Sequence, residues 1–157
     1  MTREAIIALL TRRGQTVAFA ESLTGGLACD QLIRIPGASA CVRGGVVAYQ
    51  DQIKIRALGV SPETLLQRTA VSDAVAEQMA VGVERLMNAD YAVATTGYAG
   101  PDGADVGLVY IAVSSPERVV VRGFHLTGDR DTIRKTAAKI AVSLLGGELH
   151  HGQKSNA

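Results

Sequence analysis

The chain has 157 residues, of which 47% are hydrophobic, 20% are charged and only 4% are aromatic, and its formal net charge is +1 at pH 7. This length and composition fit one globular domain with an aliphatic core and argue against a disordered chain. Because the basic residues are scattered and form no positive stripe, we expect a small-molecule partner and no direct nucleic-acid binding.

No apolar run reaches the roughly 18 residues that cross a bilayer, and the opening residues show no export pattern. Cys29 and Cys41 lack the C-x-x-C spacing of a metal or redox site, so we interpret both as small buried residues. We therefore expect a cytoplasmic protein with no membrane contact.

Helices and short strands are predicted to alternate in the first half of the chain. Apolar periodicity and the Gly and Pro punctuation give their approximate limits. In chain order they are a helix over 3–13, a strand over 16–20, a helix ending at Ile35, a strand over 44–49, a short helix containing Lys54 and a helix that starts at Pro62.

The second half begins with a long amphipathic helix for which Ser72 is the predicted cap. It continues with a strand over 91–95, a Gly/Pro-rich loop over 96–103, strands over 106–114 and 118–126, and a helix from Asp129. Residues 1–145 are expected to form one domain, and residues 146–157 a disordered tail. The fold class is α/β, a three-layer α/β/α sandwich with a mixed, mostly parallel sheet.

Two Gly-rich turns follow predicted strands, one after Ala20 and one after Thr95, and ligands of such sheets bind at strand ends. Ser22 lies on the first turn, where backbone N–H groups at the helix start favour negative charge. Such a turn could hold a phosphate or an oxyanion. The alternative is that Ser22 or Thr24 only caps the helix.

A serine nucleophile needs a neighbouring base, which is usually His or a Lys whose pKa is lowered by burial. His125 lies in an edge-like strand, and His150 and His151 lie in the tail, so packing or solvated roles are expected for all three. Lys54 follows a buried strand and would lie at the same edge of the sheet as Ser22. The alternative for Lys54 is a solvated side chain.

Seven blocks along the chain together match a known family pattern. They are AESLTGG at 20–26, PGAS at 36–39, GGVVAY at 44–49 with Lys54, LGV at 58–60, AVS at 70–72, TGYAGPDG at 96–103 and GDR at 128–130. This pattern resembles the C-terminal domain of the competence/damage-inducible CinA family, whose free-standing members include nicotinamide-nucleotide amidohydrolases. The resemblance covers residues 3–145.

The resemblance implies hydrolysis of the carboxamide of nicotinamide mononucleotide to nicotinic acid mononucleotide and ammonia, without a metal or cofactor. Ser22 would be the nucleophile and Lys54 its base, with the oxyanion held by the N–H groups near Thr24, Gly25 and Gly26. The Tyr49 hydroxyl would orient the lysine or the substrate, unless Tyr49 only ends a strand. The implied substrate-binding residues are Thr24, Gly25, Gly26, Thr96, Gly97, Gly100 and Asp102.

The chain departs from the family pattern in three places. Leu23 replaces the usual Cys after the nucleophile, which is a mild change, and Gln67-Arg68-Thr69 replaces the glycine usual just before the AVS block. The loop over 103–107 is shortened and lacks the lysine and proline of the amidohydrolases. The alternatives are a non-catalytic paralogue that binds a nucleotide or a protein partner, and an amidase for another small amide. A homo-oligomer is expected, of a size that the sequence does not fix.

Overall fold

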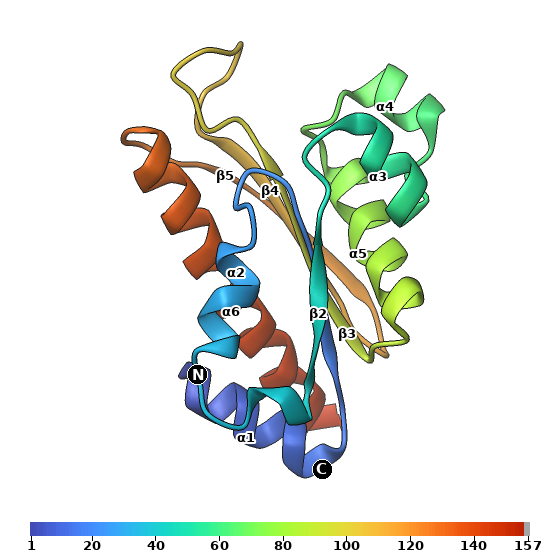
Figure 1. Cartoon of the computed structure of the whole chain (residues 1–157), viewed down its shortest axis with the longest axis vertical. Coiled ribbons are helices and arrows are strands. Elements are labelled where there is room, and N and C mark those ends of the chain that lie inside the picture. The colour runs from blue at the N-terminus through green and yellow to red at the C-terminus, as the bar shows by residue number, and fades with distance from the viewer. Residues whose placement is uncertain (156–157) are drawn as a thin grey trace.

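The structure is a computed structural model that describes residues 1–155. Helices cover both faces of a central five-stranded sheet (Figure 1), which gives the three expected layers. Helices α1, α2 and α6 lie on one face, and α3, α4 and α5 lie on the other. The elements are α1 (Arg3–Arg13), β1 (Val17–Glu21), α2 (Leu27–Ile33), a 3-10 turn η1 (Ala38–Ala40), β2 (Val42–Val47), α3 (Asp51–Leu58), α4 (Pro62–Arg68), α5 (Asp73–Met87), β3 (Tyr91–Gly97), β4 (Leu108–Ser114), β5 (Val119–His125) and α6 (Arg130–Ser155).

The strand order of the sheet is β2-β1-β3-β4-β5. Strand β1 pairs in parallel with β2 and β3, whereas β3 with β4 and β4 with β5 pair antiparallel. The expectation of a mixed sheet is confirmed, but the expectation of a mostly parallel one is wrong. Helical connections let β1, β2 and β3 run in the same direction. A loop and a hairpin then reverse the direction of the chain twice.

Two apolar layers flank the sheet, and alternate residues of β1 point into each. Val17 and Phe19 pack with α1, α2 and α6, and Ala18 and Ala20 pack with α5. All four are completely buried. The small alanines leave room for α5 to lie close to the sheet. The buried side chains are mostly aliphatic, as the composition predicts.

Helix ends follow the predicted signals. The Ser72 hydroxyl accepts a hydrogen bond from the Val75 N–H at 3.2 Å, which confirms it as the cap of α5. Pro62 lies in the first turn of α4, and Gly14 ends α1 with a φ of 62°. These local signals therefore set the limits of several elements.

The C-terminal helix is longer than expected. A disordered tail is predicted over 146–157, but α6 continues to Ser155, and residues 156–157 lie outside the described part of the chain. Leu145 and Leu149 are completely buried, so one apolar stripe holds the helix on the sheet past the two glycines at 146 and 147. None of the helices within residues 1–155 combines the length and apolar character needed to cross a bilayer.

Candidate active site

The turn over residues 22–26 follows the carboxyl end of β1 and leads into α2. The Glu21 carboxylate is buried and accepts hydrogen bonds from the N–H groups of Ala28 at 2.9 Å and Cys29 at 3.0 Å. Glu21 therefore caps α2, and neither Ser22 nor Thr24 does. The start of α2 is already neutralised by a carboxylate, so an anion would have to bind to the turn itself.

Ser22 and Lys54 are in contact. The parallel pairing of Glu21 with Val47 brings the end of β2 beside the turn, and α3 then carries Lys54 back toward it. The Lys54 Nζ donates to Ser22 Oγ at 3.2 Å, and the exposed fractions are 7% for Ser22 and 1% for Lys54. The solvated alternative for Lys54 is therefore wrong.

Two backbone carbonyls hold the Lys54 amine. Its Nζ donates to the oxygen of Ala48 at 2.9 Å and to the oxygen of Tyr49 at 3.3 Å. Burial lowers the pKa of Lys54, and the Asp51 carboxylate, 4.0 Å from Nζ, opposes that shift. Because the Asp51 side chain is 61% exposed, solvent screens its charge well. The lowered pKa therefore makes Lys54 easier to deprotonate than a free lysine.

A buried threonine of β3 fixes the Ser22 turn. The N–H of Ser22 donates to the Thr95 carbonyl at 3.1 Å, and the Thr95 and Thr24 hydroxyls hydrogen-bond to each other at 2.7 Å. Both threonines are completely buried. The Thr24 side chain therefore holds the turn against the sheet, and only its backbone can face a ligand. Sequence reasoning missed Thr95 because the partner lies 71 residues away along the chain.

The expected set of oxyanion donors changes in one member. The Gly25 N–H donates to the Ser22 carbonyl at 3.1 Å and is therefore occupied. The N–H groups of Leu23, Thr24 and Gly26 have no hydrogen-bond partner among residues 1–155. The N–H groups of this turn that remain free to bind an anion are thus those of Leu23, Thr24 and Gly26, and that of Gly25 is not.

The second Gly-rich turn is largely structural. The Thr96 hydroxyl is buried and donates to the Ala70 carbonyl at 2.7 Å, which ties β3 to the connection between α4 and α5. A Cβ on Gly97 would lie 2.7 Å from the Val109 side chain, so close packing on β4 requires glycine there. Gly100 has a φ of 78°, and Asp102 is exposed. Among the residues that the resemblance implies on this turn, Thr96 uses its hydroxyl within the fold and Asp102 is exposed, while ligand contacts of Gly97, Gly100 and Asp102 stay predictions.

Two arginines at the start of α6 reach the turns, and the sequence signal for them was slight. The Arg130 guanidinium donates to the Gly100 carbonyl and, at 2.9 Å, to the Tyr49 hydroxyl. The Arg134 Nε donates to the Leu23 carbonyl at 2.7 Å. The Tyr49 carbonyl accepts a hydrogen bond from Lys54, and the Tyr49 hydroxyl accepts one from Arg130. Within residues 1–155 the Tyr49 hydroxyl therefore does not make the expected contact with Lys54. Arg130 belongs to the GDR block, and nothing in the sequence marked Arg134.

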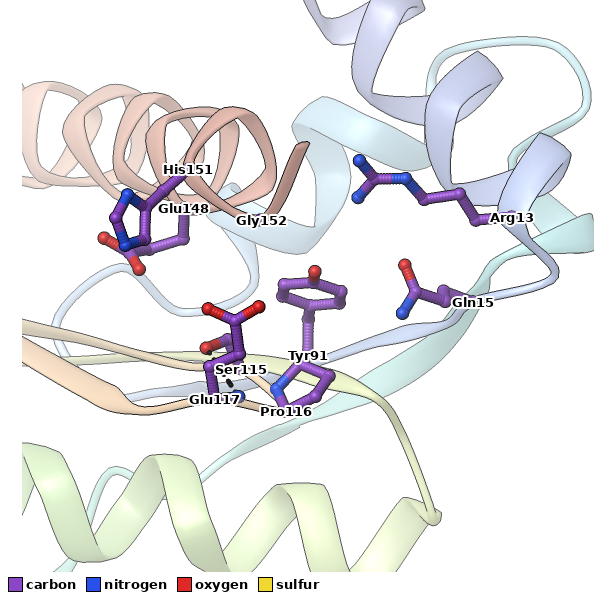
Figure 2. Close-up of a pocket in the computed structure, with 9 residues that line it drawn as sticks. All are labelled: Arg13, Gln15, Tyr91, Ser115, Pro116, Glu117, Glu148, His151 and Gly152. Atoms are coloured by element: carbon purple, nitrogen blue, oxygen red, sulfur yellow. Dashed lines mark hydrogen bonds between the residues drawn. The ribbon is translucent and has the colours of Figure 1, made fainter. Parts of the chain in front are cut away.

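The turns that carry these groups gather at one end of the sheet, near the start of α6, and the chain termini lie at the other end (Figure 1). A cavity of about 300 Å³ is found near the opposite end, where β3 begins. Figure 2 shows its lining, which includes Tyr91, Arg13 and Glu117 and no residue of the Ser22 turn. The candidate active site therefore lies apart from this cavity, at the carboxyl end of β1.

A sequence profile of the CinA C-terminal domain matches residues 1–149. The chain belongs to the CinA C-terminal domain family. A CinA-like protein of Thermosynechococcus vestitus is 47% identical over 148 residues, covering 90% of this chain and 36% of that protein. A putative competence-damage inducible protein of Caldicellulosiruptor saccharolyticus is 43% identical over 146 residues, with the same two shares covered. The chain thus spans about a third of the length of these curated CinA relatives.

Solved CinA structures have the same fold. The competence/damage inducible protein CihA from Agrobacterium tumefaciens superposes with a TM-score of 0.90 at 38% identity, covering 94% of this chain and 93% of that one. A CinA superfamily protein from Klebsiella pneumoniae superposes with a TM-score of 0.90 at 33% identity, covering 95% and 96%. The CinA C-terminal domain therefore occurs in these structures as a chain of similar length.

Proposed function

We propose that this domain is an amidohydrolase that converts nicotinamide mononucleotide to nicotinic acid mononucleotide and ammonia. The observation that carries the proposal is the 3.2 Å contact between Lys54 Nζ and Ser22 Oγ, two buried groups at the end of a strand. The substrate class rests on the resemblance to the CinA family, whose free-standing members include nicotinamide-nucleotide amidohydrolases.

The Lys54 environment supports a role as general base. A neutral lysine amine has two hydrogens and one lone pair, and the carbonyls of Ala48 and Tyr49 provide acceptors for both hydrogens. The lone pair is then left for the Ser22 hydroxyl. Burial, which lowers the pKa of Lys54, favours this protonation state.

The reaction follows from this pair. Ser22 Oγ attacks the carboxamide carbon while Lys54 takes its proton, and the oxyanion accepts hydrogen bonds from free N–H groups of the turn. The Lys54 ammonium then protonates the amide nitrogen, which leaves as ammonia when the C–N bond breaks. Water, deprotonated by Lys54, hydrolyses the resulting ester, and the proton returns to Ser22 Oγ as the acid leaves.

Arg130 supports a nucleotide substrate despite the shortened loop over 103–107. Its guanidinium lies between Tyr49 and Gly100, one from each of two loops that border the site. An arginine at that rim supplies a positive charge and a planar set of donors suited to a phosphate. It could therefore serve in place of the lysine that the amidohydrolases carry in this loop.

The test is ammonia release from nicotinamide mononucleotide, with the acid product separated by chromatography. Wild type and Ser143→Ala, an exposed serine on α6, should release ammonia, and Ser22→Ala should not. Undiminished release by Ser22→Ala would contradict the mechanism. Thermal stabilisation of wild type by the nucleotide without ammonia release would instead favour a non-catalytic paralogue, the reading that the shortened loop suggests.

A further inference from the structure

Arg134 contacts the backbone of the nucleophile turn from 111 residues away in the sequence. Its Nε donates to the Leu23 carbonyl at 2.7 Å, and its side chain is 31% exposed. A Cβ built on Gly25 would lie 3.0 Å from the Arg134 Nη2, and Gly25 has a φ of 58°. The edge of the guanidinium that carries Nε and Nη2 therefore faces the turn, and the residue of the turn beside Nη2 is a glycine.

The contact constrains the peptide that joins Leu23 to Thr24. In a planar trans peptide, the C=O and the following N–H point in opposite directions. With the Leu23 carbonyl held by Arg134, the Thr24 N–H is turned away from α6, and it has no hydrogen-bond partner among residues 1–155. The Thr24 hydroxyl is fixed on Thr95 at 2.7 Å, so this peptide is held at both ends.

We propose that Arg134 is a positioning residue that orients the Thr24 N–H as a donor to the oxyanion formed when Ser22 attacks. The inference rests on the proposed function and extends it to a residue that the CinA blocks in this sequence do not include. The positive charge at the carbonyl also polarises the peptide and strengthens its N–H as a donor.

Direct binding of substrate by Arg134 is the competing role, and the contacts oppose it. The Arg134 Nε is occupied by Leu23, and Asp131 Oδ1 lies 3.9 Å from Nη1. A phosphate would meet Arg130 first, because that side chain is exposed and lies between the two loops. The two roles make different kinetic predictions, since a substrate ligand acts on KM and an oxyanion donor acts on kcat.

The variants are Arg134→Gln, Arg134→Lys and, as the matched control, Lys135→Gln, which removes the neighbouring positive charge of α6. Loss of one oriented oxyanion donor lowers kcat by about 100-fold. Arg134→Gln should show that loss with KM changed less than about threefold, while Lys135→Gln stays within about twofold of wild type in both. Arg134→Lys keeps the charge but loses the planar guanidinium, so its kcat should lie between that of Arg134→Gln and that of wild type.

Two further readouts separate positioning from a disturbed fold. The pH at which kcat/KM rises should be the same in Arg134→Gln and wild type, because the contacts of Lys54 are untouched. Ethylguanidinium added to Arg134→Ala should restore part of the lost kcat. A loss confined to KM, an unchanged kcat, or a shifted pH profile without rescue would overturn the proposal.

A fluorophosphonate probe tests the same point without the nucleotide. Ser22 Oγ displaces fluoride from phosphorus, its proton passes to Lys54, and negative charge develops on the phosphoryl oxygen. Labelling should be fast in wild type, absent in Ser22→Ala and about tenfold or more slower in Arg134→Gln. Fast labelling of wild type without nucleotide turnover would overturn the proposed substrate alone. Labelling of Arg134→Gln at the wild-type rate would overturn the role of Arg134.

Discussion

Replacing Lys54 by Met removes the amine and keeps an unbranched side chain of similar length in a buried position. The variant should lose the proposed general base, which lowers kcat by about 10² to 10⁴. Its effect on stability has two opposed parts. The carbonyls of Ala48 and Tyr49 lose a donor, at about 1 kcal/mol each, but the cost of burying a protonated amine disappears.

The pH dependence of stability separates these two parts. Burial lowers the pKa of Lys54 in the folded protein below the value of 10.5 that applies to the unfolded chain. Between the two values the unfolded chain binds more protons, so the wild-type free energy of unfolding rises with pH, by about 1.4 kcal/mol for each pKa unit of the shift. Below the lowered pKa both states are protonated, and the burial penalty is present in full.

Urea unfolding of wild type and Lys54→Met at pH 7, 8, 9 and 10 measures this difference. The free energy of unfolding of wild type minus that of the variant should increase with pH, and Lys139→Met, an exposed lysine on α6, should show no such trend. The kcat/KM of wild type should rise with pH over a range that lies below 10.5. A difference that is flat, or that falls as the pH rises, would refute a lowered Lys54 pKa.

Two predictions concern the framework of the site. Glu21→Gln keeps one acceptor oxygen for the Ala28 and Cys29 N–H groups and loses the charge. It should therefore lower the free energy of unfolding, measured in urea, by about 1 to 3 kcal/mol. An unchanged unfolding midpoint would contradict the capping role of Glu21. Gly82→Ala would place a Cβ 1.8 Å from the Leu58 carbonyl oxygen where α5 meets α3, and should cost about 2 kcal/mol or more. Gly147→Ala, an exposed helical position with open space, should instead raise stability by about 0.5 to 1 kcal/mol in the same assay, and equal effects of the two would refute the packing argument.

Most elements could be predicted because their signals are local. Ser72 caps α5 through a hydroxyl three residues from its partner, and Pro62 and Gly14 mark ends that depend on their own φ values. The prediction of a disordered C-terminal tail was wrong because the helix there depends on a distant contact. The glycines at 146 and 147 weaken helix propensity, but the buried Leu149 restores the helix through a contact that propensity does not include.

The site was predicted in part, according to how far apart its members lie. The Ser22 turn is a local pattern, Lys54 was inferred from its place after a buried strand, and the resemblance added Tyr49 and the role of each residue. Sequence reasoning gave Gly25 and Thr96 to the ligand, whereas the folded chain uses the Gly25 N–H and the Thr96 hydroxyl for its own hydrogen bonds. Which backbone N–H groups remain free depends on the φ values of the turn, and these are fixed by the packing around it.

The sequence by itself determined the kind of protein: an α/β domain with an aliphatic core and a serine on a strand-to-helix turn, and the family to which it belongs. Those features are carried by composition, by residues a few positions apart, and by blocks in a fixed order. Tertiary structure alone decided that the sheet is half antiparallel, that Lys54 is buried against Ser22, and that Arg134 holds the turn. Each of these depends on strand pairing and helix packing between distant segments, whose free energy no local window of sequence contains.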